Sequence, residues 1–481
     1  MRKPGSQPAT KRGLPGSLLV LLFILAALTP LAGAHLTGLE SAGGVQEFAT
    51  ALGLTAASLL FLQFLSSGRY ESLSGRTGID RTMGFHRIAA YVLLLFALLH
   101  PLAYVAATAL IDPSAALPRL TGMLTSPRLG TGVAALAGLV LLVGLGVLRE
   151  RVKVSYEIWR ASHGVMAAAA AGLTLHHAVS SGAYSWERPL SGIWIGLAAI
   201  ASGALSIVYF VRPWRMWRQG WRVDKVRPLG DRTWEITLRA PDTARFDFRA
   251  GQFIWLTMAP HRPPFHDHPF SIASAPNELP QLRLIVREAG DCTNDFGRIK
   301  PGTRVAVDGP HGSFTLGGSG RTVVMVAGGV GIAPLLGMLE QAALARDRRS
   351  FRLLYAARRP SELSGIERLR ELQSVIDLKV GYFVDMGTCE SEFVQAPISA
   401  AHLSEAVGSS PPDAVAYVCG PPRMMERVTD LLLDLQVPAE AIHYERFDFG
   451  AGRGRLDRAR TRQTLAIFVV LAMGMVLFAL R

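Results

Sequence analysis

The fold of this chain is decided by two stretches of its sequence: GFHRIAAYVLLLFALLHPLAYVAATAL at Gly84–Leu110 and IWRASHGVMAAAAAGLTLHHAV at Ile158–Val179. Each stretch has roughly the 20 apolar residues that cross about 30 Å of hydrocarbon. Each also contains histidines, and an ionisable side chain inside a membrane is costly unless it has a partner. We therefore expect two membrane-spanning helices whose histidines bind a ligand.

The spacing of these histidines points to haem. His86 and His100 are 14 residues apart, and His163 and His177 repeat that spacing. In an α-helix, 14 residues return a side chain to nearly the same face about 21 Å further along the axis. Two such helices can hold two haems, one above the other. An iron with imidazole on both sides has no open position, so it carries electrons.

We expect His86 and His163 to bind an inner haem near the cytoplasmic surface. We expect His100 and His177 to bind an outer haem. His176 is the alternative to His177: its spacing of 13 from His163 places it on a different face, but a π-bulge or kink would favour it. The alternative for all of them is a lone histidine bonded to the backbone or to another histidine.

Other apolar runs extend this membrane region. They lie at Leu14–His35, Val45–Leu65, Gly130–Leu148 and Leu190–Val211. Together with the two stretches above they predict six spans within residues 14–211. The first run resembles a cleavable signal peptide as well, because Ala32–Gly33–Ala34 ends it with small residues. Near the C-terminus, Leu465–Leu480 follows a series of arginines. It predicts a further transmembrane helix over residues 464–480, with a membrane-surface tail as the alternative.

Composition agrees with a membrane protein that also has polar domains. Of the 481 residues, 49% are apolar and 18% are charged, against about 25% charged in ordinary soluble proteins. The mean hydropathy of +0.27 argues against an all-soluble protein and excludes a disordered chain. The three cysteines form neither a disulfide framework nor a zinc motif. They lie in the polar half, which we expect in a reducing compartment.

The distribution of basic residues predicts the orientation. The net charge of +13 comes largely from residues that flank the spans, so we expect membrane lipid rather than nucleic acid as the partner. Clusters precede the first span and follow the second, fourth and sixth spans, whereas the opposite loops carry only Arg119, Arg128 and Arg188. The positive-inside rule then predicts a multi-pass protein of the cell or inner membrane. Its N-terminus (residues 1–13) and all residues after Val211 would be cytoplasmic.

The sequence pattern changes after the sixth span, and the new pattern predicts a flavin site. Short β-rich runs replace the apolar ones, and the motif His268-Pro269-Phe270-Ser271 precedes a strand over Leu282–Val286. In a flavin site an aromatic ring such as Phe270 can cover one ring face, and a hydroxyl such as Ser271 can bond the ring edge. Gly290 and Thr293, at the start of a following helix, would donate backbone N–H groups to the pyrophosphate. An ordinary strand-edge turn is the alternative.

Repeated strand–turn–helix units predict a doubly wound α/β nucleotide domain. A buried strand over Arg321–Ala327 ends in Gly328-Gly329-Val330-Gly331-Ile332-Ala333-Pro334. Glycines there let a phosphate approach the backbone at a helix N-terminus. A second strand ends in Arg358-Arg359, whose guanidinium groups can pair with the 2′-phosphate of NADP, or else form a solvated basic turn. A later strand ends in Cys419-Gly420-Pro421-Pro422.

In this order the motifs resemble the ferric reductase and NADPH oxidase superfamily. The resemblance implies a six-helix dihaem transmembrane domain (14–211), an antiparallel β-barrel FAD-binding domain (216–318) and an NAD(P)-binding domain (320–450). It implies that His268, Pro269, Phe270 and Ser271 contact the flavin, and that Gly328, Gly329, Gly331 and Pro334 contact the dinucleotide. Cys419, Gly420 and Pro421 would lie near the nicotinamide, and Phe447 would stack on the flavin where the nicotinamide enters.

The sequence departs from the family in three ways. His268 stands where soluble ferredoxin-reductase relatives usually have arginine, although the membrane reductases share the histidine. Family chains commonly stop just after the aromatic residue at the position of Phe447, whereas this chain continues into an apolar tail. No calcium-binding loop precedes the spans, so we do not expect control by calcium.

We therefore expect a flavohaem oxidoreductase. NADPH or NADH would give a hydride to FAD on the cytoplasmic side. Electrons would then pass singly through two haems b to an acceptor on the far side. A ferric chelate is slightly favoured over oxygen, whose reduction would produce superoxide. The alternative of another class is a haem-bearing subunit that hands electrons to a protein partner.

Overall fold

A computed structural model describes residues 13–67, 70, 75–149, 151, 154–184, 187–242, 246–258, 266–290, 293–317, 320–386, 392–446 and 452–481. The described residues form two compact units, each with a core of its own. The helical unit comprises residues 13–74, 81–211 and 461–481, and the α/β unit comprises residues 75–80 and 212–460.

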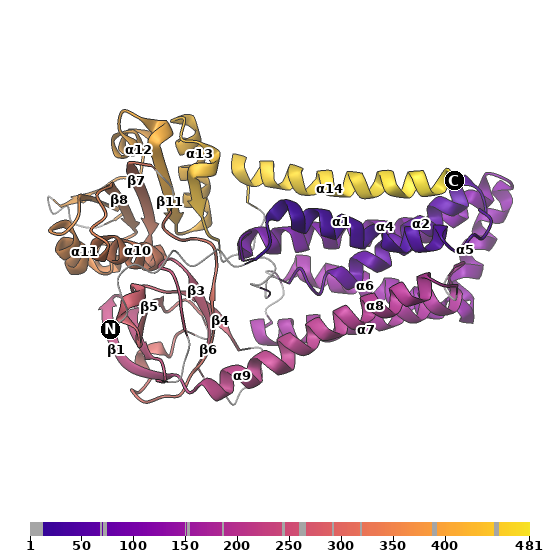
Figure 1. The fold of residues 1–481 in the computed structure, drawn as a ribbon, viewed down its shortest axis with the longest axis horizontal. Helices are drawn as coiled ribbons and strands as arrows, with labels where there is room; N and C mark the ends of the chain where they lie inside the picture. Colours follow the sequence, from indigo (N-terminus) through magenta and orange to yellow (C-terminus); the bar gives the residue numbers. More distant parts are fainter. Residues whose placement is uncertain are drawn as a thin grey trace. The chain divides into compact units, whose positions relative to one another are not determined.

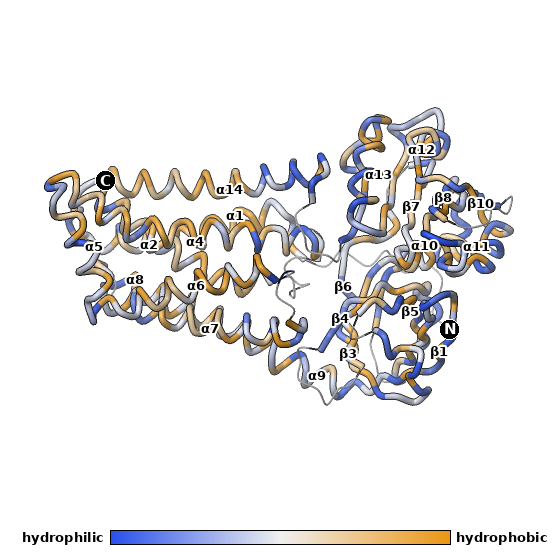
Figure 2. Tube along the Cα trace, turned by 180° about the vertical axis from the view of Figure 1, so that it is seen from behind, coloured by the Kyte–Doolittle hydropathy of each residue, from blue (hydrophilic) through white to orange (hydrophobic). Residues whose placement is uncertain are grey.

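The helical unit is a bundle (Figure 1). Its helices are α1 (Gly16–His35), α2 (Gly44–Leu62), α4 (Ile79–Ala109), α5 (Ala116–Thr125), α6 (Gly130–Leu148), α7 (Tyr156–Ser181), α8 (Leu190–Ser206) and α14 (Arg455–Ala479). Among the described residues, six helices are long and apolar enough to cross a membrane; they are α1, α2, α4, α6, α14 and the continuous helical segment that begins with α8. Figure 2 shows how apolar residues dominate these helices along most of their length.

The sequence-predicted span at 158–179 forms α7, which is 26 residues long but is not one of these six. His163, His176 and His177 lower its hydropathy relative to its neighbours. The helix nonetheless packs against α2, α6 and α8 within the bundle. A helix whose polar groups are shared with neighbouring helices needs less apolar character than one that faces lipid on every side.

The C-terminal helix α14 is integrated into the bundle core. Phe468, Leu471 and Met475 are buried in one hydrophobic cluster with residues of α1, α2 and α4. Gly474 lies so close to Leu28 of α1 that a Cβ atom would stand 2.9 Å from a leucine methyl carbon. Such packing favours a seventh bundle helix over a membrane-surface tail. The helix begins at Arg455, earlier than the apolar run alone predicts, because the arginines form its first turns.

The first part of the α/β unit is a small antiparallel barrel of two three-stranded sheets. The sheet order is β1-β2-β5 for Arg222–Gly230, Thr233–Arg239 and Gln281–Arg287, and β4-β3-β6 for His268–Ser271, Phe253–Thr257 and Ala306–His311. Alternate residues of both sheets, such as Ile236, Ile254 and Leu284, share one buried core. The barrel strands fall inside the predicted range 216–318.

The second part is a six-stranded parallel sheet in the order β10-β9-β8-β7-β11-β12. The strands are β7 (Thr322–Gly328), β8 (Ser350–Ala357), β9 (Leu378–Val384), β10 (Phe393–Val394), β11 (Ala414–Cys419) and β12 (Ile442–Tyr444). The helices are α10 (Ile332–Leu344), α11 (Ile366–Gln373), α12 (Ala400–Val407) and α13 (Pro422–Asp434). The remaining helix, α9 (Arg212–Gln219), precedes the barrel.

Helices cover both faces of this sheet. Val323 and Met325 of β7 pack in one core with Leu335 of α10 and Leu369 of α11. The alternate residues of β7, including Val324, pack in a second core with residues of α12 and α13. The strand order reverses between β7 and β11, which is the point where doubly wound sheets bind ligands beyond the carboxyl ends of their strands.

Candidate functional site

His100 in α4 is held in one tautomer by the backbone of α2. Its Nδ1 donates to the carbonyl oxygen of Ala49 at 2.7 Å. Because a carbonyl oxygen only accepts, the proton must be on Nδ1, and Nε2 is left with a free lone pair. Metal-binding histidines usually donate their second ring nitrogen to a carbonyl or carboxylate in this way.

His177 and His100 line the same cavity, which has a volume of about 550 Å³. The two imidazoles are close enough to interact electrostatically. Nδ1 of His177 is buried without a hydrogen-bond partner among the described residues. His176 is exposed instead, and its Nδ1 lies 3.2 Å from the hydroxyl of Thr131. The structure thus brings His177, and not His176, together with His100.

The cavity is apolar and shaped by small residues. Its volume falls within the range of about 300–1,000 Å³ that is typical of cofactor pockets. Gly53 and Gly132 line it, and a Cβ atom on Gly132 would stand 2.6 Å from Cε1 of His177. Arg119 of α5 is the one residue with a permanent charge in the described lining.

The second histidine pair, toward the other end of α4, has a matching arrangement. Ser66 donates its hydroxyl proton to Oε1 of Gln63 at 2.6 Å, so it accepts from Nδ1 of His86 at 2.9 Å. Gln63 also donates to the carbonyl oxygen of His86 at 2.9 Å. His163 is close enough to His86 for an electrostatic interaction. Its ring stacks on Trp159 with centroids 5.2 Å apart.

The α4 histidine of each pair fits haem by the chemistry of its donor atoms. His86 and His100 each direct Nδ1 to an acceptor and keep Nε2 for an iron. Among the described residues no cluster of three or more His, Cys, Asp or Glu side chains is placed to hold a metal ion. A haem iron needs only two axial imidazoles, since the porphyrin supplies its other four ligands. His100 and His177, which line one apolar cavity, satisfy that need.

The predicted flavin motif forms strand β4 at the barrel. Its residues pair with β3, so that Leu256 lies opposite His268 and Phe253 lies opposite Ser271. All four side chains, including that of Pro269, are half-buried. The ring of Phe270 packs against Phe296, with centroids 5.5 Å apart. The strand therefore presents polar and aromatic side chains at the barrel surface rather than only in its core.

The helix expected after Gly290 and Thr293 is not formed. The chain makes a tight turn in which Thr293 and Asn294 both donate their N–H groups to the carbonyl oxygen of Gly290, at 3.0 and 3.1 Å. Only a three-residue 3₁₀ turn, Phe296–Arg298, follows. The prediction of a helix was wrong because the threonine hydroxyl and the glycine carbonyl close the turn on themselves: Ala289 N–H donates to the Thr293 hydroxyl at 2.8 Å.

The glycine-rich turn after β7 and the turn after β11 lie against each other. Gly328 ends β7, and Gly329–Gly331 form a 3₁₀ turn before α10 begins at Ile332. A Cβ on Gly328 would stand 2.5 Å from Cδ of Pro421, and one on Gly331 would collide with the carbonyl oxygen of Cys419. Gly329 has φ of +53° and faces open space. Pro334 is buried in the first turn of α10.

Two predicted nucleotide-contacting groups differ in exposure. Arg358 and Arg359 directly follow β8 and are exposed. They lie at the same carboxyl edge of the sheet as the glycine turn, because β8 pairs with β7 and Ala356 lies opposite Gly328. Cys419 is buried, and burial raises the pKa of its thiol to about 12, with the charge of Glu445 adding to the shift. The raised pKa favours the protonated Cys419 thiol at neutral pH.

The structure leaves one predicted site residue untested and adds residues that the sequence did not indicate. Phe447 is outside the described residues, so its stacking role stays a prediction. The residues that orient the histidines were not predicted. Ala49 acts through its backbone, which carries no sequence signal. The glycines that make room for His100 and His177 resemble the other small residues of membrane helices.

Comparisons with known proteins agree with this geometry. Family models match for the ferric reductase like transmembrane component over residues 52–174, the FAD-binding domain over 218–315 and the oxidoreductase NAD-binding domain over 325–430. The first range includes His86, His100 and His163 and ends before His177.

Three similar proteins each match about half of this chain. Ferredoxin–NADP reductase B of Sorangium cellulosum is 30% identical over 47% of this chain and 96% of its own length. The reductase component of propane 2-monooxygenase from Rhodococcus jostii is 28% identical over 47% of this chain, which spans 62% of that protein. The FAD/NAD-binding domain of a nitric oxide dioxygenase from Vibrio cholerae aligns with a TM-score of 0.43 and 22% identity, over 48% of this chain and 98% of that domain.

The fold and the three family models define a multi-pass membrane oxidoreductase with FAD- and NAD-binding domains. The chain belongs to the ferric reductase and NADPH oxidase superfamily. The resemblance stated from the motifs is confirmed.

Proposed function

We propose that this protein is a flavohaem enzyme that carries electrons from cytoplasmic NAD(P)H across the membrane to an acceptor such as a ferric chelate. The observation that carries the proposal is the pairing of histidines on α4 and α7. Each histidine of α4 has a hydrogen bond that frees Nε2, and His100 shares an apolar cavity with His177. This arrangement suits an electron carrier, because passing electrons between haems requires no general acid, base or nucleophile.

In this proposal His86 and His163 hold an inner haem b, and His100 and His177 hold an outer one. When bound, FAD accepts a hydride from NAD(P)H, and haem iron passes electrons singly. The α2 carbonyl at Ala49 and the Ser66 hydroxyl keep the α4 imidazoles oriented. Gly53 and Gly132 leave space for the imidazole rings of His100 and His177, which would hold the outer haem.

The α/β unit would supply the reducing equivalents. We assign His268, Pro269, Phe270 and Ser271 of β4 to the flavin, with Gly290 and Thr293 near its pyrophosphate and Phe447 over its ring. The hydroxyl of Ser271 would bond the reacting edge of the flavin. We propose the same domain limits as the sequence predicts, which are 14–211, 216–318, 320–450 and 464–480.

The nucleotide would bind where the two turns meet. We assign Gly328, Gly329, Gly331 and Pro334 to its phosphates. Cys419, Gly420 and Pro421 would contact the nicotinamide, and Arg358 and Arg359 the 2′-phosphate of NADPH. The open space at Gly329 and the close approach of Gly331 to Cys419 support this assignment. Cys419 keeps its proton in the buried turn, so it shapes the pocket without reacting.

The acceptor would bind at the outer side of the helical unit. Clusters of basic residues flank the spans on the side of the α/β unit, whereas the opposite loops carry few, which favours a cytoplasmic α/β unit. Arg119 gives the cavity a positive charge, which can pair with a carboxylate of a haem propionate or of a ferric chelate. Reduction of oxygen to superoxide, and electron delivery to a protein partner, are the competing functions.

A difference spectrum during titration with NADPH tests the proposal. The purified full-length protein, loaded with FAD and haem, should show low-spin b-type haem that NADPH reduces. Haem that is absent after adequate cofactor supply, or that NADPH does not reduce, would overturn it. Ferric chelate reduction unaffected by superoxide dismutase supports the favoured acceptor. Cytochrome c reduction abolished by the dismutase indicates oxygen, and inactivity with every small acceptor indicates a protein partner.

A further inference from the structure

Helix α10 joins the nucleotide turn to the barrel. Its first residue, Ile332, directly follows the turn Gly329–Gly331. Further along the helix, a Cβ on Gly337 would lie 3.0 Å from the carbonyl oxygen of Ser274. Gln341 accepts the N–H of Ala250 through its side-chain oxygen at 3.1 Å. One face of α10 therefore rests directly on the chain that follows the flavin motif of β4.

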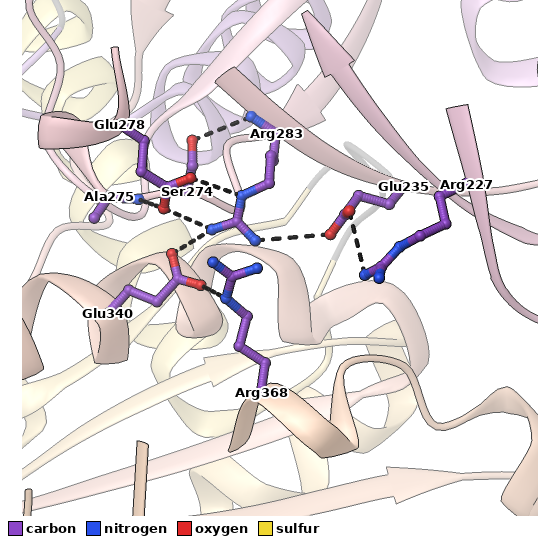
Figure 3. A network of polar contacts seen from close by, with 8 residues as sticks. All are labelled: Arg227, Glu235, Ser274, Ala275, Glu278, Arg283, Glu340 and Arg368. Carbon is purple, nitrogen blue, oxygen red and sulfur yellow. Dashed lines mark hydrogen bonds and ion pairs between the residues drawn. The ribbon is translucent and has the colours of Figure 1, made fainter. Parts of the chain in front are cut away.

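A buried ionic network reinforces this contact (Figure 3). Arg283 of β5 and Glu340 of α10 form its centre, with Nη2 and Oε2 2.5 Å apart. Only 7% of either side chain is exposed. Arg283 also donates to Glu278 at 2.7 and 2.9 Å, and lies 3.7 Å from Glu235. The other oxygen of Glu340 pairs with Arg368 of α11.

Burying these charges costs free energy, so a gain in stability alone does not explain the network. A buried ion pair is often no more stabilising than well-packed apolar residues of the same size. Its directional hydrogen bonds instead specify one register between the packed elements, a role attested for buried polar groups elsewhere. Burial raises the pKa of Glu340 to about 7, while Arg283 and Arg368 oppose that shift.

The network lies between the segments assigned to the flavin and to the dinucleotide, so the packing register that it specifies also sets how these segments are placed. The backbone N–H of Arg283 donates to the hydroxyl of Ser274 at 3.1 Å, and Ser274 lies three residues after Ser271. Glu340 lies on the helix that begins at the nucleotide turn. The pair therefore links the two segments assigned to the flavin and to the dinucleotide. A displacement of about 1 Å between reacting groups can slow a reaction roughly 100-fold.

We propose that Arg283 and Glu340 are positioning residues that fix the placement of the nucleotide turn relative to flavin strand β4. The proposal rests on the proposed function for its effect on hydride transfer. It makes a structural claim that is independent of that function: without the pair, α10 loosens on the barrel.

The test compares full-length, FAD-loaded protein in detergent at pH 8, where Glu340 is charged. The variants are Glu340→Gln, Arg283→Lys and the double variant Arg283→Met/Glu340→Met. Asp377→Asn is the control, because it breaks the pair between Arg352 and Asp377 (3.1 Å), whose carboxylate is 52% exposed. Hydrogen–deuterium exchange reports on the amides of α10, and stopped-flow flavin bleaching by NADPH reports on hydride transfer.

We expect faster exchange in α10, but not in α13, for both single variants. We also expect hydride transfer slowed at least roughly tenfold, with FAD content intact and the KM for NADPH changed less than threefold. The double variant removes both charges of the central pair but leaves Glu278 and Arg368 without that partner, so an intact FAD content is the check that it folds. Its hydride transfer should still be slow. The control should match the wild type.

The outcomes separate this inference from the proposed function. Wild-type exchange in α10 of both single variants would overturn the inference, whether or not NADPH reduces the flavin. Wild-type hydride transfer in the double variant would also overturn it, because apolar packing alone would then suffice. A wild-type protein whose flavin NADPH does not reduce would overturn the proposed function, and exchange alone would then decide the role of the pair.

Discussion

Gly53 of α2 lies directly against the imidazole of His100 in α4, where a Cβ atom would stand 2.5 Å from Cε1 and 2.6 Å from Nδ1. One turn before Gly53 in the same helix, Ala49 accepts the Nδ1 proton of that imidazole. The two residues fix the ring from two sides: one supplies the acceptor and the other supplies the space. The absence of a side chain at position 53 is thus a requirement of the histidine.

We predict that Gly53→Ala lowers haem content. The added methyl group must displace the His100 ring, and the hydrogen bond to Ala49 would break or lengthen. The ratio of haem to protein should fall to about half, because only the outer site is affected. Pyridine haemochrome assays measure the ratio. Gly138→Ala in α6 is the control, since a Cβ there meets open space. Equal haem content in the two variants would contradict the prediction.

The two adjacent histidines of α7 should differ in effect. His177→Ala removes a ring that lines the cavity with His100, so it should remove about half of the haem and the transfer of electrons to external acceptors. His176→Ala removes an exposed ring that bonds Thr131, and haem content should stay near that of the wild type. Difference spectra of both variants check this. Loss of haem in the His176 variant alone would reverse the assignment.

The sequence predicted what depends on local periodicity. The length of the apolar runs predicted the membrane spans. The 14-residue spacing predicted that His86 and His100 share one face of α4, and α2 or the turn after it contacts both histidines. Residues that act through the backbone, such as Ala49, leave no signal. The pair of Arg283 and Glu340 is 57 residues apart in sequence, and only the packing of α10 on the barrel brings the two together. Around Thr293, the chain forms a turn that the threonine hydroxyl closes, in place of the expected helix.

The exposed arginines after β8 should determine the choice of nucleotide. Replacing Arg358 and Arg359 with alanine should raise the KM for NADPH by roughly 10- to 100-fold, because hydrogen bonds to charged groups contribute about 1.5–3 kcal/mol. The KM for NADH should change little, since NADH lacks the 2′-phosphate. Steady-state kinetics with both nucleotides measures the ratio. Arg352→Ala is the matched control, because Arg352 lies on β8, the strand that Arg358 and Arg359 follow, and pairs with Asp377. An equal effect on both nucleotides would remove the assignment.

The thiol of Cys419 predicts a specific dependence of stability on pH. Burial raises its folded pKa to about 12, above the ordinary value of 9.0. As the pH rises past about 9, the unfolded chain releases the thiol proton while the folded chain keeps it. Wild-type stability should therefore fall relative to Cys419→Ala by about 1.4 kcal/mol per pH unit, until the folded thiol also ionises.

Thermal unfolding from pH 7 to pH 10 measures this difference. The difference in stability between the two proteins should be constant below pH 8.5. Above that pH the wild type should become less stable relative to Cys419→Ala. Alkylation gives an independent readout in a chain whose other two cysteines are replaced by alanine. Cys419 should resist iodoacetamide at pH 8.5 while the protein is folded, and it should react once the protein is denatured. Rapid alkylation of the folded protein would show an accessible thiolate, and the nicotinamide pocket would then contain a nucleophile after all.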